Sequence, residues 1–305
     1  MEFTGVFPIL PTPFHEDESV DHESFARVIH FMVEAGVSGI TILGVLGEAN
    51  RLSDREREDI IGTAVQATQG AIPIVVGTSH NGTAATIELS QMAAELGANA
   101  LMVTPHREAV PNEARIYDHF ATINERVDLP IVLQDHPGST EVHMSLDLVL
   151  RMVNDLANVA CIKQEALPTP VRVAALRNGL RRNVPILTGL GALYGAFELA
   201  SGADGFMTGF AFPEVLMAMV TAQQAADEDR VWRIYSAHLP LIVFEGQPGV
   251  AVRKHLFKLR GLIAHDTVRK PAAGINENAK QQLLQVLQRT FAERDIGKPL
   301  ELSNH

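Results

Sequence analysis

The sequence predicts an α/β protein, a (β/α)8 TIM barrel followed by a C-terminal helical extension. Short apolar runs rich in β-branched residues recur along the chain, and an amphipathic helical pattern follows most of them. The runs are apolar at nearly every position, as expected for strands of a parallel sheet that is covered on both faces. Eight successive strand–helix units of this kind are typical of the barrel.

The predicted strands follow one another at the spacing of strand–helix units, beginning roughly 20 to 35 residues apart. They lie at 5–12, 38–44, 72–79, 100–105, 129–135, 159–165, 184–189 and 205–210. A doubly wound sheet is the alternative fold. Such sheets usually carry a glycine-rich phosphate loop after the first strand, whereas this strand ends in Pro-Thr-Pro-Phe and the chain has no G-x-G-x-x-G motif. The barrel is therefore the favoured fold.

The segments between the strands carry helix start and stop signals. Asp21 is a capping residue at the start of the pattern 21–36, and Gly36 ends it. The segments 53–68 and 83–97 follow the same design. These segments are expected to form the outer helices of the barrel.

No strand pattern returns after about residue 214, and the segments 214–244 and 276–295 read as helices. We therefore expect the barrel to occupy residues 1–213. Residues 214–305 would form a helical extension packed on it.

The composition favours a cytoplasmic globular protein. The chain has 305 residues, 46% of them hydrophobic, which is enough for one large domain. Its net charge is −11, with no basic patch for nucleic acid, no long apolar run for a membrane span and no signal-peptide pattern at residues 1–14. The single cysteine, Cys161, excludes an internal disulfide and a C-x-x-C metal site. We expect no cofactor and no metal.

The sixth predicted strand carries a lysine inside an apolar run. Side chains alternate along a strand, so Cys161, Lys163 and Glu165 share one face while Ile162 and Gln164 share the other. If Lys163 faces the barrel interior, burial lowers its pKa, and a neutral amine at the mouth of a barrel can form a Schiff base with a ketone. The alternative is that Lys163 faces outward or pairs with Glu165.

Several strand-end motifs together resemble the dihydrodipicolinate synthase / N-acetylneuraminate lyase family. The motifs are GVFPILPTPF (5–14), GVLGEANRLSDRERE (44–58), GTSHNGTAATIELSQMAAELGANALMVTP (77–105), LPIVLQDHP (129–137) and ACIKQEA (160–166). The family comprises class I aldolases and dehydratases on a (β/α)8 barrel with a helical extension. The resemblance implies that Lys163 forms the Schiff base with a 2-oxo acid, and that the protein is a homo-oligomer, either a dimer or a tetramer.

The sequence departs from the synthase pattern of this family at several positions. Gln134 replaces a proton-shuttling tyrosine, and Val45 and Leu46 replace a Thr/Ser pair that holds the substrate carboxylate. His106 replaces a tyrosine after strand 4, and Ser139 replaces a carboxylate-binding arginine. A synthase that relays protons through tyrosines is therefore not expected.

Other motifs resemble a subgroup of this family that includes L-2-keto-3-deoxyarabonate dehydratase. They are the QD-x-P and K-x-E variants, HLPLI (238–242) and GADGFMTGFAFPE (202–214). The resemblance implies a dehydratase or aldolase that acts on a 2-oxo-3-deoxy sugar acid.

Several side chains are candidates for moving protons at such a site. Gln134 can hydrogen-bond a substrate hydroxyl or a water but does not titrate. Glu165 is the first candidate for proton transfer, followed by His106 and His136, which titrate near neutral pH. Glu165 could instead form a salt bridge or cap the helix that begins near Pro168.

The substrate carboxylate needs hydrogen-bond donors, and the turn at Val45, Leu46 and Gly47 can supply backbone N–H groups. Thr208 and Gly209 on the last strand are expected to line the pocket beside the iminium. Glu48 is expected to have a structural role under the loop.

Three other functions remain open. A dihydrodipicolinate synthase-like condensation of pyruvate with an aldehyde would use the same lysine. A non-catalytic 2-oxo acid binder could have the same scaffold. A metal-dependent hydrolase would use His80, His106 and His136 with Asp135, but histidines spread one per loop rarely converge on a metal.

Overall fold

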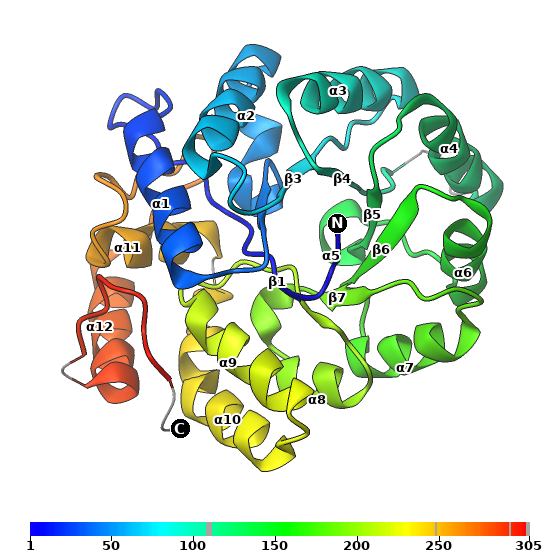
Figure 1. Cartoon of the computed structure of the whole chain (residues 1–305). Helices are drawn as coiled ribbons and strands as arrows, with labels where there is room; N and C mark the ends of the chain where they lie inside the picture. Colours follow the sequence, from blue (N-terminus) through cyan, green and yellow to red (C-terminus); the bar gives the residue numbers. More distant parts are fainter. Residues whose placement is uncertain (108–111, 248, 293, 303–305) are drawn as a thin grey trace.

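The computed structural model describes residues 1–107, 112–247, 249–292 and 294–302. Its centre is a sheet of eight parallel strands in the order β1-β8-β7-β6-β5-β4-β3-β2, curled into the barrel of Figure 1. The strands are β1 (Gly5–Val6), β2 (Ile40–Ile42), β3 (Ile74–Gly77), β4 (Ala100–Val103), β5 (Ile131–Asp135), β6 (Val159–Gln164), β7 (Ile186–Thr188) and β8 (Gly205–Phe206). This confirms the predicted fold class.

The barrel closes between its first two strands through backbone hydrogen bonds outside the regular ladder. Ile9 and Thr41 form a parallel bridge, and the Leu10 N–H donates to the Thr41 carbonyl at 2.9 Å. β1 also pairs with β8, where Gly5 lies opposite Gly205. The carboxyl ends of all eight strands therefore meet at one mouth, where barrel enzymes carry their catalytic groups.

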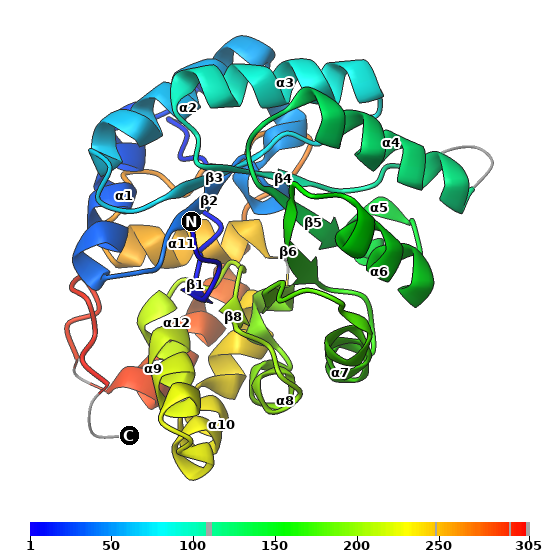
Figure 2. The ribbon, with the colours of Figure 1, turned by 45° about the vertical axis from the view of Figure 1, so that its right-hand side comes forward.

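Helices surround the barrel in both views of the ribbon (Figures 1 and 2). They are α1 (His22–Ala35), α2 (Asp54–Thr68), α3 (Thr83–Leu96), α4 (Glu113–Arg126), α6 (Leu146–Asp155), α7 (Thr169–Gly179), α8 (Gly195–Ala200) and α9 (Pro213–Gln224). Short turns of helix lie in the loops at the mouth. They are η1 (Val45–Gly47), η2 (Ala49–Arg51), α5 (Pro137–Thr140) and η3 (Leu190–Ala192).

The predicted helix signals act as expected. The Asp21 side chain accepts the Ser24 N–H, and Gly36 ends α1 in the left-handed conformation with φ 78°. Ser53 and Glu56 form a reciprocal capping box at the start of α2. These local contacts fix where each helix leaves the mouth of the barrel.

Two hydrophobic clusters lie on opposite sides of the sheet. The larger one fills the layer between strands and helices and includes Ile162 and Phe206. The smaller one fills the barrel and includes Cys161, Leu187 and Met207. Neighbours on one strand therefore face different cores, which confirms the alternation predicted for the sixth strand.

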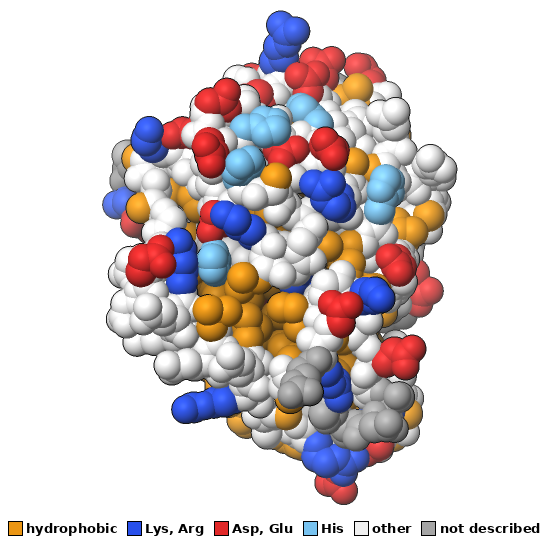
Figure 3. Space-filling model, turned by 90° about the vertical axis from the view of Figure 1, so that its left-hand side faces the viewer, with side chains coloured by type: hydrophobic (Ala, Val, Ile, Leu, Met, Phe, Trp, Pro, Cys, Tyr) orange, Lys and Arg blue, Asp and Glu red, His pale blue; other side chains and the backbone are white. Residues whose placement is uncertain are grey.

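Three further helices follow the barrel, α10 (Glu228–Glu245), α11 (Val250–Leu259) and α12 (Glu277–Phe291). α9 packs on β1 and β8, and α10 packs on both α9 and α12. α11 lies beside α1 in Figures 1 and 2, and Figure 3 shows this side with an apolar hollow among charged side chains of both signs. The division of the chain at residue 213 stays a prediction.

Within the described ranges, no helix is both long and apolar enough to cross a membrane.

Candidate active site

Lys163 lies inside the barrel, on the same face of β6 as Cys161. Its side chain is only 2% exposed, and in register it lies between Gln134 of β5 and Leu187 of β7. Burial lowers the pKa of the Lys163 amine below its ordinary value, and the Glu165 carboxylate offsets part of this shift. A lysine with a lowered pKa more readily reaches the neutral form that acts as a nucleophile.

Glu165 follows β6 directly and forms the centre of a buried polar cluster. Its Oε2 lies 3.1 Å from the Lys163 Nζ and accepts a hydrogen bond of 2.7 Å from the Gln134 Nε2. Burial acts to raise the pKa of Glu165, but Lys163, His136 and Gln134 outweigh it, and the pKa is lowered. Glu165 therefore stays ionised beside the amine and can accept a proton.

The loop after β7 holds the second oxygen of this carboxylate. The Leu190 N–H donates to the Glu165 Oε1 at 3.2 Å. A Cβ on Gly189 would lie only 2.0 Å from the same oxygen, so the carboxylate fits because residue 189 is glycine. The alternative of Glu165 as a helix cap is wrong, because Pro168 occupies the N-cap position of α7.

His136 and Gln134 connect the buried pair to the surface. The His136 Nδ1 lies 3.9 Å from the Glu165 Oε2 and 2.7 Å from the Ser139 Oγ, and burial lowers the pKa of this ring. Gln134 lines a cavity of about 740 Å³. The cluster around Lys163 thus lies next to a space large enough for a sugar acid.

The same cavity carries two of the other predicted residues. His106 and Val45 line it, and the Val45 side chain is 55% exposed. The His106 ring meets the His119 ring at 5.0 Å between centroids. A second cavity of about 670 Å³ shares His106 and Glu141 with the first, and together they form a wide entrance.

The predicted anion-binding turn is the short helix η1. The Gly47 N–H donates to the Gly44 carbonyl at 3.0 Å, so a ligand contact of this turn would depend on the N–H groups of Val45 and Leu46. The Gly47 carbonyl accepts the Thr12 hydroxyl at 2.7 Å. Leu46 packs on the hydrophobic cluster inside the barrel.

Glu48 has the structural role that the sequence suggested, although with more partners than expected. Its Oε1 lies 2.5 Å from the Lys254 Nζ, and its Oε2 lies 2.7 Å from the Arg51 Nη1 and accepts the Arg269 N–H at 3.0 Å. Both Glu48 and Lys254 are fully buried side chains. The residues of α11 and of the segment after it therefore hold the loop.

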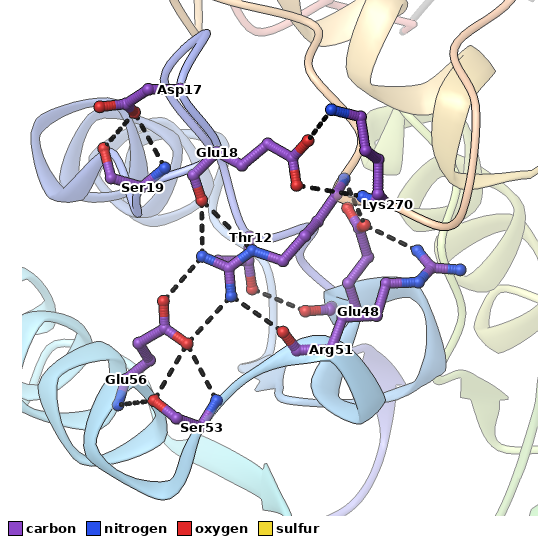
Figure 4. Close-up of polar contacts among 11 residues, drawn as sticks. Thr12, Asp17, Glu18, Ser19, Glu48, Arg51, Ser53, Glu56 and Lys270 are labelled. Carbon is purple, nitrogen blue, oxygen red and sulfur yellow. Dashed lines mark hydrogen bonds and ion pairs between the residues drawn. The ribbon is translucent and has the colours of Figure 1, made fainter.

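Arg269 extends this network, and Figure 4 labels its partners Glu18, Arg51 and Glu56. Its guanidinium donates to the Glu56 carboxylate at 2.7 and 2.9 Å, to the Arg51 carbonyl at 2.9 Å and to the Glu18 carbonyl at 2.6 Å. It also lies over the Phe14 ring. One arginine from the C-terminal part of the chain thus ties three separate N-terminal segments together beside the mouth.

Thr208 and Gly209 continue from β8 toward the mouth. The Thr208 Oγ1 accepts the Gly191 N–H at 2.7 Å, which ties the loop after β7 to the loop after β8. The Gly209 carbonyl accepts a hydrogen bond from Arg253 of α11. A Cβ on Gly209 would collide with Arg253 and with Leu46. Neither residue lines the two cavities described above, and their place beside a bound substrate stays a prediction.

Lys163, Glu165, Gln134 and His136 come together in one cluster. His106 and Val45 line the cavity beside it. Sequence reasoning did not single out the buried cations of α11, although a signal was present. Arg253 and Lys254 interrupt an apolar helical pattern, in the same way that Lys163 interrupts an apolar strand.

The metal-site alternative requires the side chains of His80, His106, His136 and Asp135 to converge. Across the described residues, no three His, Cys, Asp or Glu side chains come close enough to hold one metal ion. Asp135 points away from the mouth and pairs with Arg172 at 2.7 Å.

Comparison with known proteins gives a consistent result. A model of the dihydrodipicolinate synthetase family matches residues 2–290. An L-2-keto-3-deoxyarabonate dehydratase from Azospirillum brasilense is 31% identical over 93% of this chain and 94% of its own. A dihydrodipicolinate synthase structure from Rhodopseudomonas palustris has 34% identity and a TM-score of 0.89, covering 94% and 97% of the two chains. An E. coli prophage protein of the same family, solved with pyruvate, has 27% identity and a TM-score of 0.87, covering 95% and 99%.

Proposed function

The chain belongs to the dihydrodipicolinate synthetase family, and on this premise we propose that it is a Schiff-base-forming lyase that acts on a 2-oxo acid. The observation that carries the proposal is the buried Lys163–Glu165 pair, with 3.1 Å between Nζ and Oε2, next to a large cavity at the barrel mouth. A buried lysine with a lowered pKa is suited to covalent catalysis on a carbonyl.

In the first step the neutral Lys163 amine adds to the C2 carbonyl of the substrate. Loss of the carbonyl oxygen as water leaves an iminium, which draws electrons from the neighbouring carbons. Glu165, ionised and 3.1 Å from Nζ, can take up the proton that the amine releases. Glu165 then passes this proton to the departing hydroxyl, which leaves as water, and the carboxylate is ionised again for the next step.

In the second step a proton leaves C3, and the iminium becomes an enamine. In a 2-oxo-3-deoxy sugar acid the C4 hydroxyl then departs with a proton as water, and the iminium forms again, now conjugated to a C3–C4 double bond. Hydrolysis releases the product and restores Lys163. Glu165 is the candidate for removing the C3 proton, and His136, 3.9 Å from it, connects it toward the surface.

We propose dehydration of a 2-oxo-3-deoxy sugar acid rather than a tyrosine-relayed condensation. Gln134, which cannot titrate, donates to Glu165 inside the cluster. The chain has three tyrosines, Tyr117, Tyr194 and Tyr235, and none of them lies at the end of β4 or β5. Tyr235 donates its hydroxyl to the Leu193 carbonyl, and Tyr117 on α4 lies under the Arg151 guanidinium. The sugar-acid substrate also agrees with the likeness to the arabonate dehydratase.

Borohydride trapping tests the proposal. The protein is incubated with pyruvate or with each of several 2-oxo-3-deoxy sugar acids, reduced, and analysed by intact mass and peptide mapping. We expect a reduced adduct on the peptide that contains Lys163, and a mass lower by one water with the sugar acid that is dehydrated. Lys258→Met, on the exposed side of α11, is a matched control that should label normally.

Lys163→Met should abolish labelling while the fold is kept, because methionine fills a similar volume. Labelling of another lysine in the unaltered protein, or labelling that survives Lys163→Met, would refute the assignment. An adduct that forms without turnover of any sugar acid would favour the 2-oxo acid binder. Turnover of pyruvate with an aldehyde would favour the synthase reaction.

We also propose that the protein is a cytoplasmic homo-oligomer, a dimer or a tetramer, as the family resemblance implies. Light scattering coupled to size-exclusion chromatography gives its mass in solution. A mass of one 33.2 kDa chain would contradict this.

A further inference from the structure

Arg253 is a buried cation at the barrel mouth that the proposed mechanism does not use. Its side chain is 4% exposed and comes from α11. The Nε donates to the Glu245 Oε1 at 2.5 Å, and the Nη2 donates to the Gly209 carbonyl. The Nη1 is buried and has no hydrogen-bond partner among the described residues. A buried charged donor left unpaired is costly, so its position calls for an explanation.

The free end of this guanidinium lies beside Leu46, which packs on the hydrophobic cluster inside the barrel. Met207 belongs to the same interior cluster, and Gly209 lies two residues beyond it along the chain. The Arg253 Nη1 lies 1.7 Å from the position that a Gly209 Cβ would take, and the Leu46 Cδ1 lies 2.5 Å from it. Arg253 thus enters the mouth through the space that Gly209 leaves open, and Leu46 lies beside it.

Glu245 fixes this orientation. Its Oε1 accepts the Arg253 Nε, and its Oε2 accepts the Ala211 N–H at 2.9 Å. The guanidinium is therefore held on two sides by groups that are themselves buried. Its remaining N–H groups are preorganised for a planar acceptor such as a carboxylate.

A 2-oxo acid brings a carboxylate into this mouth. The two arginines that line the cavity already have partners, since Arg107 pairs with Glu141 and Arg57 donates to the Ala49 carbonyl at 2.7 Å. Val45 and Leu46 are apolar, and Lys163 is taken up by the Schiff base and by Glu165. A carboxylate that leaves water needs a cation or several donors.

We propose that the Arg253 Nη1 binds the carboxylate of the 2-oxo acid, with Leu46 as a side chain that moves aside when the acid enters. This inference rests on the proposed function, since it assigns a binding residue within the same site. Glu245 acts as a positioning residue for Arg253.

Trapping with two ligands tests the proposal. Pyruvate and hydroxyacetone share the reactive ketone, but only pyruvate has a carboxylate. We compare the concentration of each that gives half-maximal borohydride labelling of Lys163. In the Arg253→Gln/Glu245→Gln double variant, which leaves no buried carboxylate unpaired, the value for pyruvate should rise roughly 10- to 100-fold, as expected for loss of a charged hydrogen bond. The value for hydroxyacetone should change less than threefold.

Arg260→Lys is the matched control. Arg260 ends the same helix, is 2% exposed, and has its guanidinium hydrogen-bonded to Glu214 and to backbone carbonyls. Its replacement loosens the same region but should leave the preference for pyruvate unchanged. If the double variant does not fold, Arg253→Lys serves instead, because lysine keeps the charge but loses the fork of donors.

The outcomes separate the two proposals. No labelling of the unaltered protein would refute the proposed function and the role of Arg253 with it. If the unaltered protein labels normally and the Arg253 variant has the same half-maximal concentrations, the role of Arg253 alone is refuted. An equal rise in the half-maximal concentrations of pyruvate and hydroxyacetone would refute it too. Leu46→Ala should lower the half-maximal concentration of pyruvate, because the side chain no longer has to move aside. A higher half-maximal concentration would show that Leu46 itself forms the subsite.

Discussion

Gly189→Ala should separate Schiff-base formation from proton transfer. Gly189 lies in the loop after β7, against the carboxylate of Glu165. An added Cβ would lie 2.0 Å from Oε1, 2.3 Å from Cδ and 2.5 Å from Cγ of Glu165. The alanine therefore forces the whole carboxyl group of Glu165 out of its present position.

The size of the effect follows from this geometry. Contacts of a Cβ below 3.4 Å are already tight, so the carboxylate must move by more than about 1 Å and lose the 2.7 Å hydrogen bond from Gln134. A misplacement of about 1 Å in a catalytic group can lower the rate about 100-fold, which corresponds to about 2.7 kcal/mol of transition-state stabilisation. We expect turnover of the sugar acid to fall by that factor.

Two assays on Gly189→Ala distinguish imine formation from turnover. Turnover of the sugar acid is followed by release of the dehydrated product, and imine formation by the extent of borohydride labelling at saturating pyruvate. Turnover should fall while labelling is kept. Gly62→Ala is the control, because Gly62 lies on α2 with nothing within 4 Å of an added Cβ. It should leave both assays unchanged and stabilise the helix by up to about 1 kcal/mol.

Unchanged turnover in Gly189→Ala would refute the role of Glu165 in proton transfer. Loss of labelling together with turnover, in a variant that still melts cooperatively, would show that attack by the amine cannot proceed without the carboxylate of Glu165 in place. Glu165→Gln keeps the shape of the side chain and should show the same separation of turnover and labelling.

Three further predictions concern buried charges. Burial raises the pKa of Glu198 to about 7, so the folded chain loses stability as the pH rises from about 4.5 to 7. Glu198→Gln should therefore raise the melting temperature at pH 8, with a gain in the free energy of unfolding of up to about 3 kcal/mol, but not at pH 4.5. An equal gain at both pH values would contradict this. Lys254→Met leaves Glu48 buried without its 2.5 Å partner and should cost about 3 to 5 kcal/mol in denaturant unfolding. Lys258→Met on the same helix, where the lysine is 45% exposed, should cost less than about 1 kcal/mol, and equal losses would count against the buried pair. The labelling rate of Lys163 should rise with pH and reach half its maximum below the ordinary lysine pKa of 10.5, because burial lowers that pKa; a midpoint at or above 10.5 would contradict it.

Local patterns in the sequence were sufficient for the elements and for one face of the site. Alternation along β6 placed Lys163 and Glu165 inside, and the structure shows both predicted arrangements at once, since Lys163 faces the interior and also pairs with Glu165. The first predicted strand is shorter than expected, with β1 limited to Gly5–Val6. Pro8 and Pro11 lack the N–H that a longer ladder requires.

Contacts between distant segments could not be predicted in the same way. Leu190, in the loop after the next strand, donates a hydrogen bond to Glu165. Arg253, on a helix 44 residues after Gly209, donates one to the Gly209 carbonyl. Such pairs depend on the register of the strands and on where α11 crosses the mouth, and a single sequence fixes neither. The sequence therefore indicated the nucleophile but not the residues that hold its partners in place.

The network of Figure 4 has a consequence for the order in which the chain is made. Synthesis proceeds from the N-terminus, so the turn that begins at Val45 leaves the ribosome more than two hundred residues before Arg269 and Lys254 can reach Glu48. During that interval the Glu48 carboxylate lacks these two partners, and we expect it to stay hydrated because burial of an unpaired charge costs free energy. The mouth of the barrel is thus finished late, when the last fifth of the chain arrives, and a nascent chain stopped before residue 269 should bind no 2-oxo acid.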